Sequence, residues 1–147
     1  GCETIKECYI PDTVRIIGSR AFYKCISLSH IDFPSGIESI EKEAFYQTGL
    51  TELCLPAGLK KIGDSAFLKC NQLEYARIPE SVKCIEKWAF HGCNRLKVLE
   101  IAHDPEFIGE WIINRSAAVR CVKGSKVDDY CKRYGIYSRL SVTEAVF

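Results

Sequence analysis

The 147-residue sequence has no methionine, only two tryptophans and no apolar run near the roughly 18 residues that a membrane-spanning helix needs. It also lacks an excess of either charge, since 20 Lys and Arg residues face 19 Asp and Glu residues, for a net charge of +1. A balanced chain has no strong field to attract nucleic acid or an anionic membrane surface. We therefore expect neither nucleic-acid binding nor membrane insertion.

The local signatures of several chemistries are absent as well. The sequence contains no G-x-G-x-x-G motif and no P-loop, and its nine cysteines include no C-x-x-C pair. The first two motifs bind the phosphates of nucleotides, and the third is a common element of zinc sites. We therefore predict that the protein has no cofactor and no metal site.

The first residues of the sequence do not have the pattern of a secretory leader. Gly1-Cys2 matches Gly92-Cys93, which stands in the middle of a repeat. We interpret the chain as a processed product or as an excised piece of a longer protein.

The most informative feature that is present is a repeated phrase. It reads I-x-x-x-A-F, then a leucine four to six residues later, then I-x-I-P or a close variant. The phenylalanines of the four copies lie 23, 22 and 23 residues apart, and Ile113 follows 23 residues later. A fixed period of this size predicts a solenoid, in which each coil buries the apolar face of its neighbours. The four phenylalanines are Phe22, Phe45, Phe67 and Phe90.

Each copy divides into a V-x-x-I segment and an L-x-x-I-x-I segment. The second alternates apolar and other residues, which is the period of a half-buried β-strand. Because proline cannot donate to a strand ladder, we expect each strand to end at the proline that follows it. The Ala-Phe pair lies between the two segments, and we expect a short helical or 3₁₀ turn there. The prolines are Pro11, Pro34, Pro56 and Pro79.

The copies predict two regions. Residues 1–124 form the solenoid, with a half copy, four full copies and one degenerate copy, and residues 125–147 form a C-terminal cap and tail. Ser125 and Gly135 have the residue types that begin and end a helix, here Lys126–Tyr134. The register of the last solenoid strand, near residues 119–122, stays open: Val119 can match either Leu96 or Leu99.

The complete phrase is plainest in residues 59–79, LKKIGDSAFLKCNQLEYARIP. This pattern resembles the BspA-like leucine-rich repeat, and the resemblance covers nearly the whole chain. It implies an α/β-type repeat solenoid: a right-handed array with a parallel sheet on one face, short helical or irregular turns opposite, and a C-terminal helical cap. It also implies a secreted or bacterial surface location, and a role in cell adhesion or in binding host proteins.

The residues between the buried strand positions are expected to line the outer face of the sheet. Tyrosine and arginine are frequent anchors of protein interfaces, so this face is our candidate for binding a protein or a glycan. A solvated strand face with pairs such as Arg77–Glu100 explains the same residues, and a structural spacer is the alternative function. The candidate binding residues are Tyr9, His30, Asp32, Glu52, Tyr75, Arg77 and Glu100.

Most of the cysteines follow the repeat. One column is expected to face the core, where free cysteine behaves as a small hydrophobic residue, while Cys54 is expected on the exposed strand face. Disulfides between column neighbours stay open as an alternative. The thiol-rich composition favours a reducing compartment, whereas the resemblance favours the cell surface. The column consists of Cys2, Cys25, Cys70 and Cys93.

An enzyme is the least favoured interpretation. His91 and Cys93 resemble a catalytic pair on paper, but the Gly-Cys step between them belongs to the repeat, and no third group orients them. Asp32 and Glu52 form a possible carboxylate pair, but no insertion is long enough to build a cleft around them. We therefore predict a non-catalytic protein with no catalytic residues.

Overall fold

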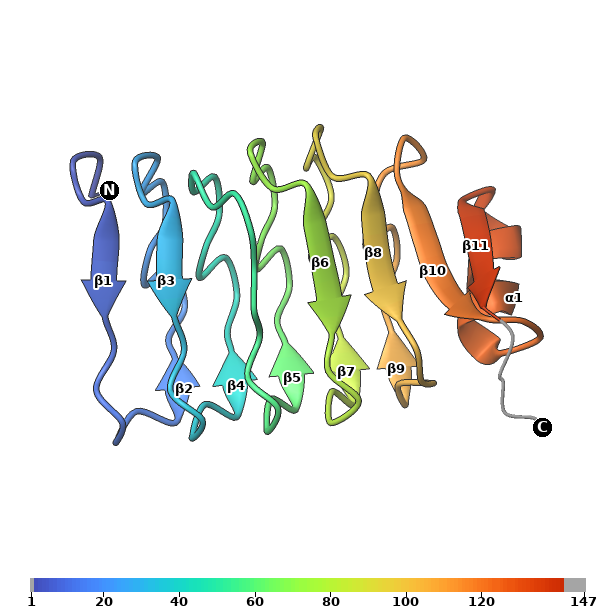
Figure 1. Cartoon of the computed structure of the whole chain (residues 1–147), viewed down its shortest axis with the longest axis horizontal. Coiled ribbons are helices and arrows are strands. Elements are labelled where there is room, and N and C mark those ends of the chain that lie inside the picture. Colours follow the sequence, from blue (N-terminus) through green and yellow to red (C-terminus); the bar gives the residue numbers. More distant parts are fainter. Residues whose placement is uncertain (1, 142–147) are drawn as a thin grey trace.

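The computed structural model describes residues 2–141, and for Leu140 and Ser141 it describes the backbone alone. The chain forms a solenoid of about six coils stacked in a row, with a helix at the C-terminal end (Figure 1). One side carries the strands that the longer repeat segment predicts and one further strand near the C-terminus, all parallel. This side, the front sheet, consists of β1 (Glu7–Tyr9), β3 (His30–Asp32), β6 (Tyr75–Ile78), β8 (Val98–Ile101), β10 (Ala118–Val122) and β11 (Tyr137–Ser141).

A second parallel sheet runs along the solenoid. It was not predicted, because we expected a sheet on one face only. Its strands come from the V-x-x-I segments and their equivalent in the degenerate copy, and they pair in the order β2-β4-β5-β7-β9. Each has only two residues, too few to show the alternation by which a strand is recognised. The strands of this second sheet are β2 (Ile16–Ile17), β4 (Ser39–Ile40), β5 (Lys61–Ile62), β7 (Cys84–Ile85) and β9 (Phe107–Ile108).

The strands of the front sheet are paired in two groups, β1-β3 and β6-β8-β10-β11, and between them the coil of the second copy contributes the single bridge from Leu53 to Ala76 of β6. At its far end Val119 pairs with Leu99, which decides between the two registers that the sequence allowed. This register places Val119 and Cys121 in the core and leaves Arg120 exposed. The register is thus set by the burial of the apolar strand residues and not by the strict 23-residue period.

The Ala-Phe segments form a third side of the coil, the turn side. We expected short helical or 3₁₀ turns there, but these segments are not helical. They are successive tight turns: the Ala21 amide donates to the Gly18 carbonyl at 3.1 Å, whereas the Phe22 amide donates to Ala44 of the next coil at 2.7 Å. Arg20 and Lys24 hold positive φ angles of 58°. Alternate amides therefore join neighbouring coils, which the internal hydrogen bonds of a helix would prevent.

The repeated phenylalanines form one continuous stack in the core. Ring centroids of Phe45 and Phe67 are 5.1 Å apart, and those of Phe67 and Phe90 are 5.0 Å apart, with interplanar angles of 2° and 4°. These three rings are fully buried, while Phe22 in the first full copy is half-buried. The stack confirms that the Ala-Phe pair directs its ring inward.

The second full copy is one residue shorter than the others, and Gly49 lies where the residue is missing. A Cβ atom at Gly49 would come within 2.3 Å of the Ile26 carbonyl oxygen. Only glycine permits this close approach of one coil to the next.

The helix α1 (Lys126–Tyr134) has the predicted bounds. The Ser125 hydroxyl accepts a hydrogen bond from the Asp128 amide at 3.1 Å, and Gly135 ends the helix with a φ of 68°. The strand β11 behind it was not predicted and pairs in parallel with β10. Its Ser138 donates to the buried Asp128 carboxylate at 3.3 Å, so a polar residue stands where the strand pattern requires an apolar one.

Candidate functional site

The seven candidate binding residues all lie on the front sheet or on the coil that bridges it. Tyr9 pairs with Asp32 and Arg77 with Glu100, so corresponding positions of successive coils stand side by side as the sequence predicted. Tyr9 is 81% exposed and Tyr75 44% exposed. His30, Asp32, Glu52 and Arg77 are also exposed, and Glu100 is half-buried.

Three of these residues form a connected cluster on β6 and β8. The Tyr75 hydroxyl donates to Glu100 Oε1 at 2.6 Å, and Arg77 Nε lies 3.7 Å from Glu100 Oε2. The hydrogen bond to the Glu100 carboxylate raises the pKa of Tyr75. The predicted Arg77–Glu100 pair is thus present, and Glu100 fixes the tyrosine and the arginine in one arrangement.

The other candidates lie towards the N-terminal end of the front sheet. His30 Nε2 is 3.1 Å from Asp32 Oδ1, with both side chains exposed. Glu52 lies on the following coil, which separates this pair from the Tyr75–Arg77–Glu100 cluster. The structure therefore divides the seven residues into two groups along the sheet.

The strand β11 adds residues that sequence reasoning missed. Arg139 pairs with Arg120, which pairs with Glu100, and Tyr137 at the start of β11 is 67% exposed. The front sheet therefore carries Glu7, Asp32 and Glu52 on its first coils and mainly arginines on its last ones. No apolar alternation marks residues 137–141, so the strand pattern did not predict this extension.

The cysteine column belongs to the scaffold. Cys70 Sγ donates to the Phe45 carbonyl at 3.1 Å, and Cys93 Sγ to the Phe67 carbonyl at 3.2 Å. Burial raises the pKa of Cys25 to about 11. Cys25, Cys70 and Cys93 are buried free thiols, Cys2 is a half-buried one, and Cys54 is exposed as predicted.

The His91–Cys93 pair has no arrangement suited to nucleophilic catalysis. The Cys93 side chain is 2% exposed, and its hydrogen bond to Cys70, together with burial, raises the pKa of its thiol. A nucleophilic cysteine needs a lowered pKa and an accessible sulfur. Within residues 2–141 no three His, Cys, Asp or Glu side chains are grouped to hold a metal ion. The helix of that part of the chain is too short and polar to cross a membrane.

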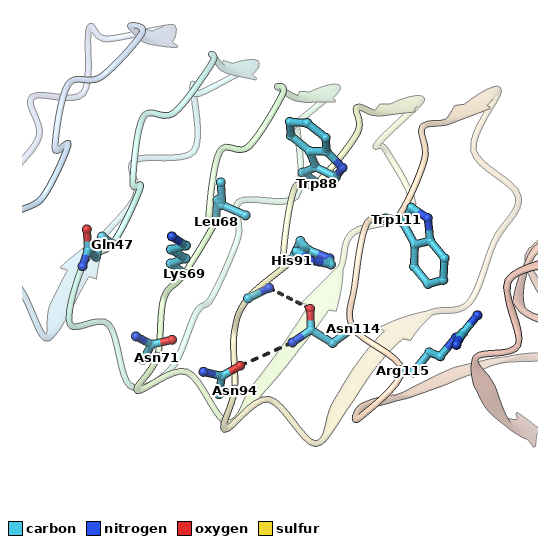
Figure 2. A pocket seen from close by; sticks show the side chains of 11 residues that line it. Gln47, Leu68, Lys69, Asn71, Trp88, His91, Asn94, Trp111, Asn114 and Arg115 are labelled. Atoms are coloured by element: carbon cyan, nitrogen blue, oxygen red, sulfur yellow. Dashed lines mark hydrogen bonds between the residues drawn. The ribbon is translucent and has the colours of Figure 1, made fainter.

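An open groove lies away from the front sheet, on the turn side near the C-terminal end (Figure 2). Its volume is about 1090 Å³. Trp88 and Trp111, on neighbouring coils, stand along one side of it, and Asn94 and Asn114 are hydrogen-bonded to each other on the other side (Figure 2). The sequence signal was available, because the two tryptophans are 23 residues apart, one repeat period.

The coil geometry and the Phe stack agree with a comparison against protein-family models. Residues 1–120 match the model of the BspA type leucine rich repeat region, with six copies. The chain belongs to this family. The family consists of repeat modules of the kind that bind proteins or stand on surfaces, and its members are generally not enzymes.

Solved structures show the same fold. A leucine-rich repeat protein of T. pallidum is 23% identical to this chain with a TM-score of 0.76. The superposed part covers 97% of this chain and 76% of the T. pallidum chain. The pneumococcal vaccine antigen PcpA is 19% identical with a TM-score of 0.72, covering 93% of this chain and 42% of its own. A leucine-rich cell surface protein of Faecalibacterium prausnitzii is 24% identical to this chain with a TM-score of 0.56. The superposed part covers 80% of this chain and 41% of that protein's chain. No curated protein matches the chain significantly.

Among these solved structures, one is described as a cell surface protein and another as a vaccine antigen. The expectation of a reducing compartment, drawn from the thiols, has no support among them.

Proposed function

We propose that the protein is a non-catalytic recognition module that binds another protein through its front sheet. The candidate contact residues are the seven positions that the sequence predicts for that face, extended by Arg120, Tyr137 and Arg139. A secreted or cell-surface location agrees with the relatives, and α1 with β11 acts as a cap that covers the apolar end of the last coil.

The observation that supports this proposal most is the Tyr75–Arg77–Glu100 cluster. Tyrosine and arginine contribute most binding energy in many protein interfaces. Here Glu100 already holds both side chains in place, so less conformational entropy is lost when a partner binds. The acidic first coils and basic last coils add a charge pattern that a complementary partner can match in one orientation.

A structural spacer within a longer repeat protein is the alternative. A spacer needs only soluble outward residues, and these can be the same on every coil. Here one outward column changes with each coil, from Tyr9 and Asp32 through Cys54 to Arg77 and Glu100. This variation favours recognition over a spacer.

The test is a direct binding measurement with purified extracellular-matrix, plasma and epithelial surface proteins on a biosensor. For each protein that binds, we expect the double variant Tyr75→Ala and Arg77→Ala to weaken binding at least a hundredfold. The melting temperature should stay within a few degrees, since both side chains are largely exposed. The matched control is Lys60→Ala with Lys83→Ala, which removes two exposed lysines near the second sheet.

Equal binding by the Tyr75→Ala, Arg77→Ala variant would show that the front sheet is not the site. Loss of binding in the lysine control alone would move the site to the second sheet. Failure of every protein on the panel to bind would favour the spacer.

A further inference from the structure

The groove on the turn side contains residues that the repeat does not require. The repeat position occupied by Trp88 and Trp111 holds Arg20, Glu43 and Ser65 in the earlier coils. The same positive φ recurs there, 59° at Ser65 and 62° at Trp88. The backbone therefore forms equally well around a serine, and Trp88 is nevertheless 42% exposed. An exposed tryptophan that the scaffold does not need is a candidate contact for a ligand.

Gly92 lines the groove without a side chain of its own. The corresponding residues of the neighbouring coils are Gln47, Lys69 and Arg115, whose side chains cover the turn side. The ladder between coils also changes here, because the Gly92 amide donates to Asn114 Oδ1 at 2.7 Å where the Lys69 amide donates to a main-chain carbonyl at 2.8 Å. The Lys69 side chain lies against Gly92, because a Cβ atom at Gly92 would come within 2.9 Å of Lys69 Cγ. A longer side chain at this position would displace Lys69 and narrow the groove.

Carboxamide side chains line the other side of the groove. They come from successive coils, which lie about 4.8 Å apart, so the lined length over four coils is roughly 14 Å. A carboxamide has two N–H donors and an oxygen acceptor, the groups that match a sugar hydroxyl. Asn114 uses part of this capacity for its hydrogen bonds with Gly92 and Asn94. The flat apolar faces of sugar rings suit the faces of tryptophan. The amides are Gln47, Asn71, Asn94 and Asn114.

The charged side chains of the groove are all cationic. Lys69 and Arg115 line it, and within the described part of the chain no Asp or Glu does. The Arg115 guanidinium lies 5.2 Å from the centre of the Trp111 ring, and its Nε donates to the Tyr134 carbonyl at 3.3 Å. These contacts hold the arginine beside the aromatic surface, where its other N–H groups can pair with a carboxylate.

We propose that this groove binds a short oligosaccharide that carries a carboxylate, such as a uronate- or sialate-containing glycan. Trp88 and Trp111 stack on sugar rings, the amides bind hydroxyls, and Arg115 or Lys69 pairs with the acid. The site lies on a different side of the coil from the front sheet and does not depend on the protein-binding function proposed above.

The two tryptophans make the test specific, because they are the only two in the chain and both line the groove. Their fluorescence therefore reports on this site alone. We would titrate the protein with sialyllactose and with oligogalacturonate, and with lactose and a neutral galactose oligomer as matched controls. A saturable change in emission with one of the acidic sugars, at least tenfold tighter than with its neutral counterpart, is the expected result.

Two variants test where the sugar binds. Trp88→Ser restores the residue type of Ser65 and keeps Trp111 as the reporter. Gly92→Gln introduces the residue type of Gln47, which has a φ of 56° at this repeat position, and displaces the Lys69 side chain that lies against Gly92. We expect each to weaken binding at least tenfold with a cooperative melt retained. The front-sheet variant Tyr75→Ala, Arg77→Ala should bind the sugar normally, which separates this proposal from the previous one.

Three results would overturn the assignment. One is the absence of any saturable response to either acidic sugar. Another is equal affinity for the neutral sugars, which would remove the role of Lys69 and Arg115. The third is unchanged affinity in folded Trp88→Ser and Gly92→Gln proteins.

Discussion

A single repeat position has the same backbone in every coil, and its side chain alone decides whether it serves the scaffold or a surface. The phenylalanine position is the same in the four full copies, and Phe45, Phe67 and Phe90 are fully buried there and stack in the core. The position two residues earlier differs from coil to coil, and in two coils it is a tryptophan. Constant residues thus mark stability, and varied exposed residues mark candidate contacts.

Phe67→Ala should destabilise the protein by about 3–5 kcal/mol, the usual cost of truncating a large buried side chain. Phe67 is fully buried and stacks on rings on both sides, so its loss leaves a cavity that two coils cannot fill. Urea unfolding followed by circular dichroism measures the change. Phe22→Ala is the control, since Phe22 is only half-buried, and it should cost distinctly less. A loss of under 1 kcal/mol for Phe67→Ala would contradict the core assignment.

The elements of this fold are too short to be stable alone. The second sheet has strands of two residues, and the turn side has no regular element, yet each coil is hydrogen-bonded to the next at both places. Stability therefore comes from the neighbouring coil and not from the segment itself. The helix α1 is the exception, because its ends are fixed by local hydrogen bonds at Ser125 and Gly135.

Ser125→Ala should destabilise the C-terminal end by about 1 kcal/mol, because it removes the hydroxyl that accepts from the Asp128 amide. Ser125→Asp supplies another acceptor and should retain most of the stability. Urea unfolding of both variants provides the measurement. Equal stability of the alanine and aspartate variants would mean that water satisfies the amide and that the cap bond is dispensable.

At the scale of the whole molecule, the solenoid is a one-dimensional stack in which contacts connect neighbouring coils. The central coils have a neighbour on each side, whereas β1 pairs only with β3 within the described residues. Apolar side chains are also more exposed on the first coils, where Ile5, Ile16 and Ile26 are 42%, 57% and 53% exposed. Local stability should therefore vary along the axis.

Hydrogen exchange measured by mass spectrometry should show this gradient. We expect the slowest exchange in the amides of Phe45, Phe67 and Phe90, which donate to the next coil at 2.7 to 2.8 Å within the buried stack. We expect the fastest exchange among the strand amides in β1. Uniform protection from β1 to β8 would show that the array opens as one cooperative unit.

The sequence predicted mainly those features that recur in every copy of the repeat. The inward phenylalanines, the front strands, the helix bounds and the Arg77–Glu100 pair all depend on periodicity or on residue types with a fixed preference. The second sheet was missed because two-residue strands show no alternation, and the turns because positive φ angles lie at Arg20, Lys69 and similar residues instead of at glycine. The groove was missed although its two tryptophans are one repeat period apart, because a pair of tryptophans on neighbouring coils belongs to no known motif.

The hydrogen bonds between coils have a mechanical consequence, since they point along the long axis of the molecule. A pull on one end of the chain loads the bonds of the outermost coil and leaves the remaining coils intact until that coil has detached. Each detachment would release one repeat of 22 or 23 residues, an extended length of roughly 75 Å. Under tension the protein would lengthen in equal steps, with its inner binding surfaces preserved while the outer coils absorb the force.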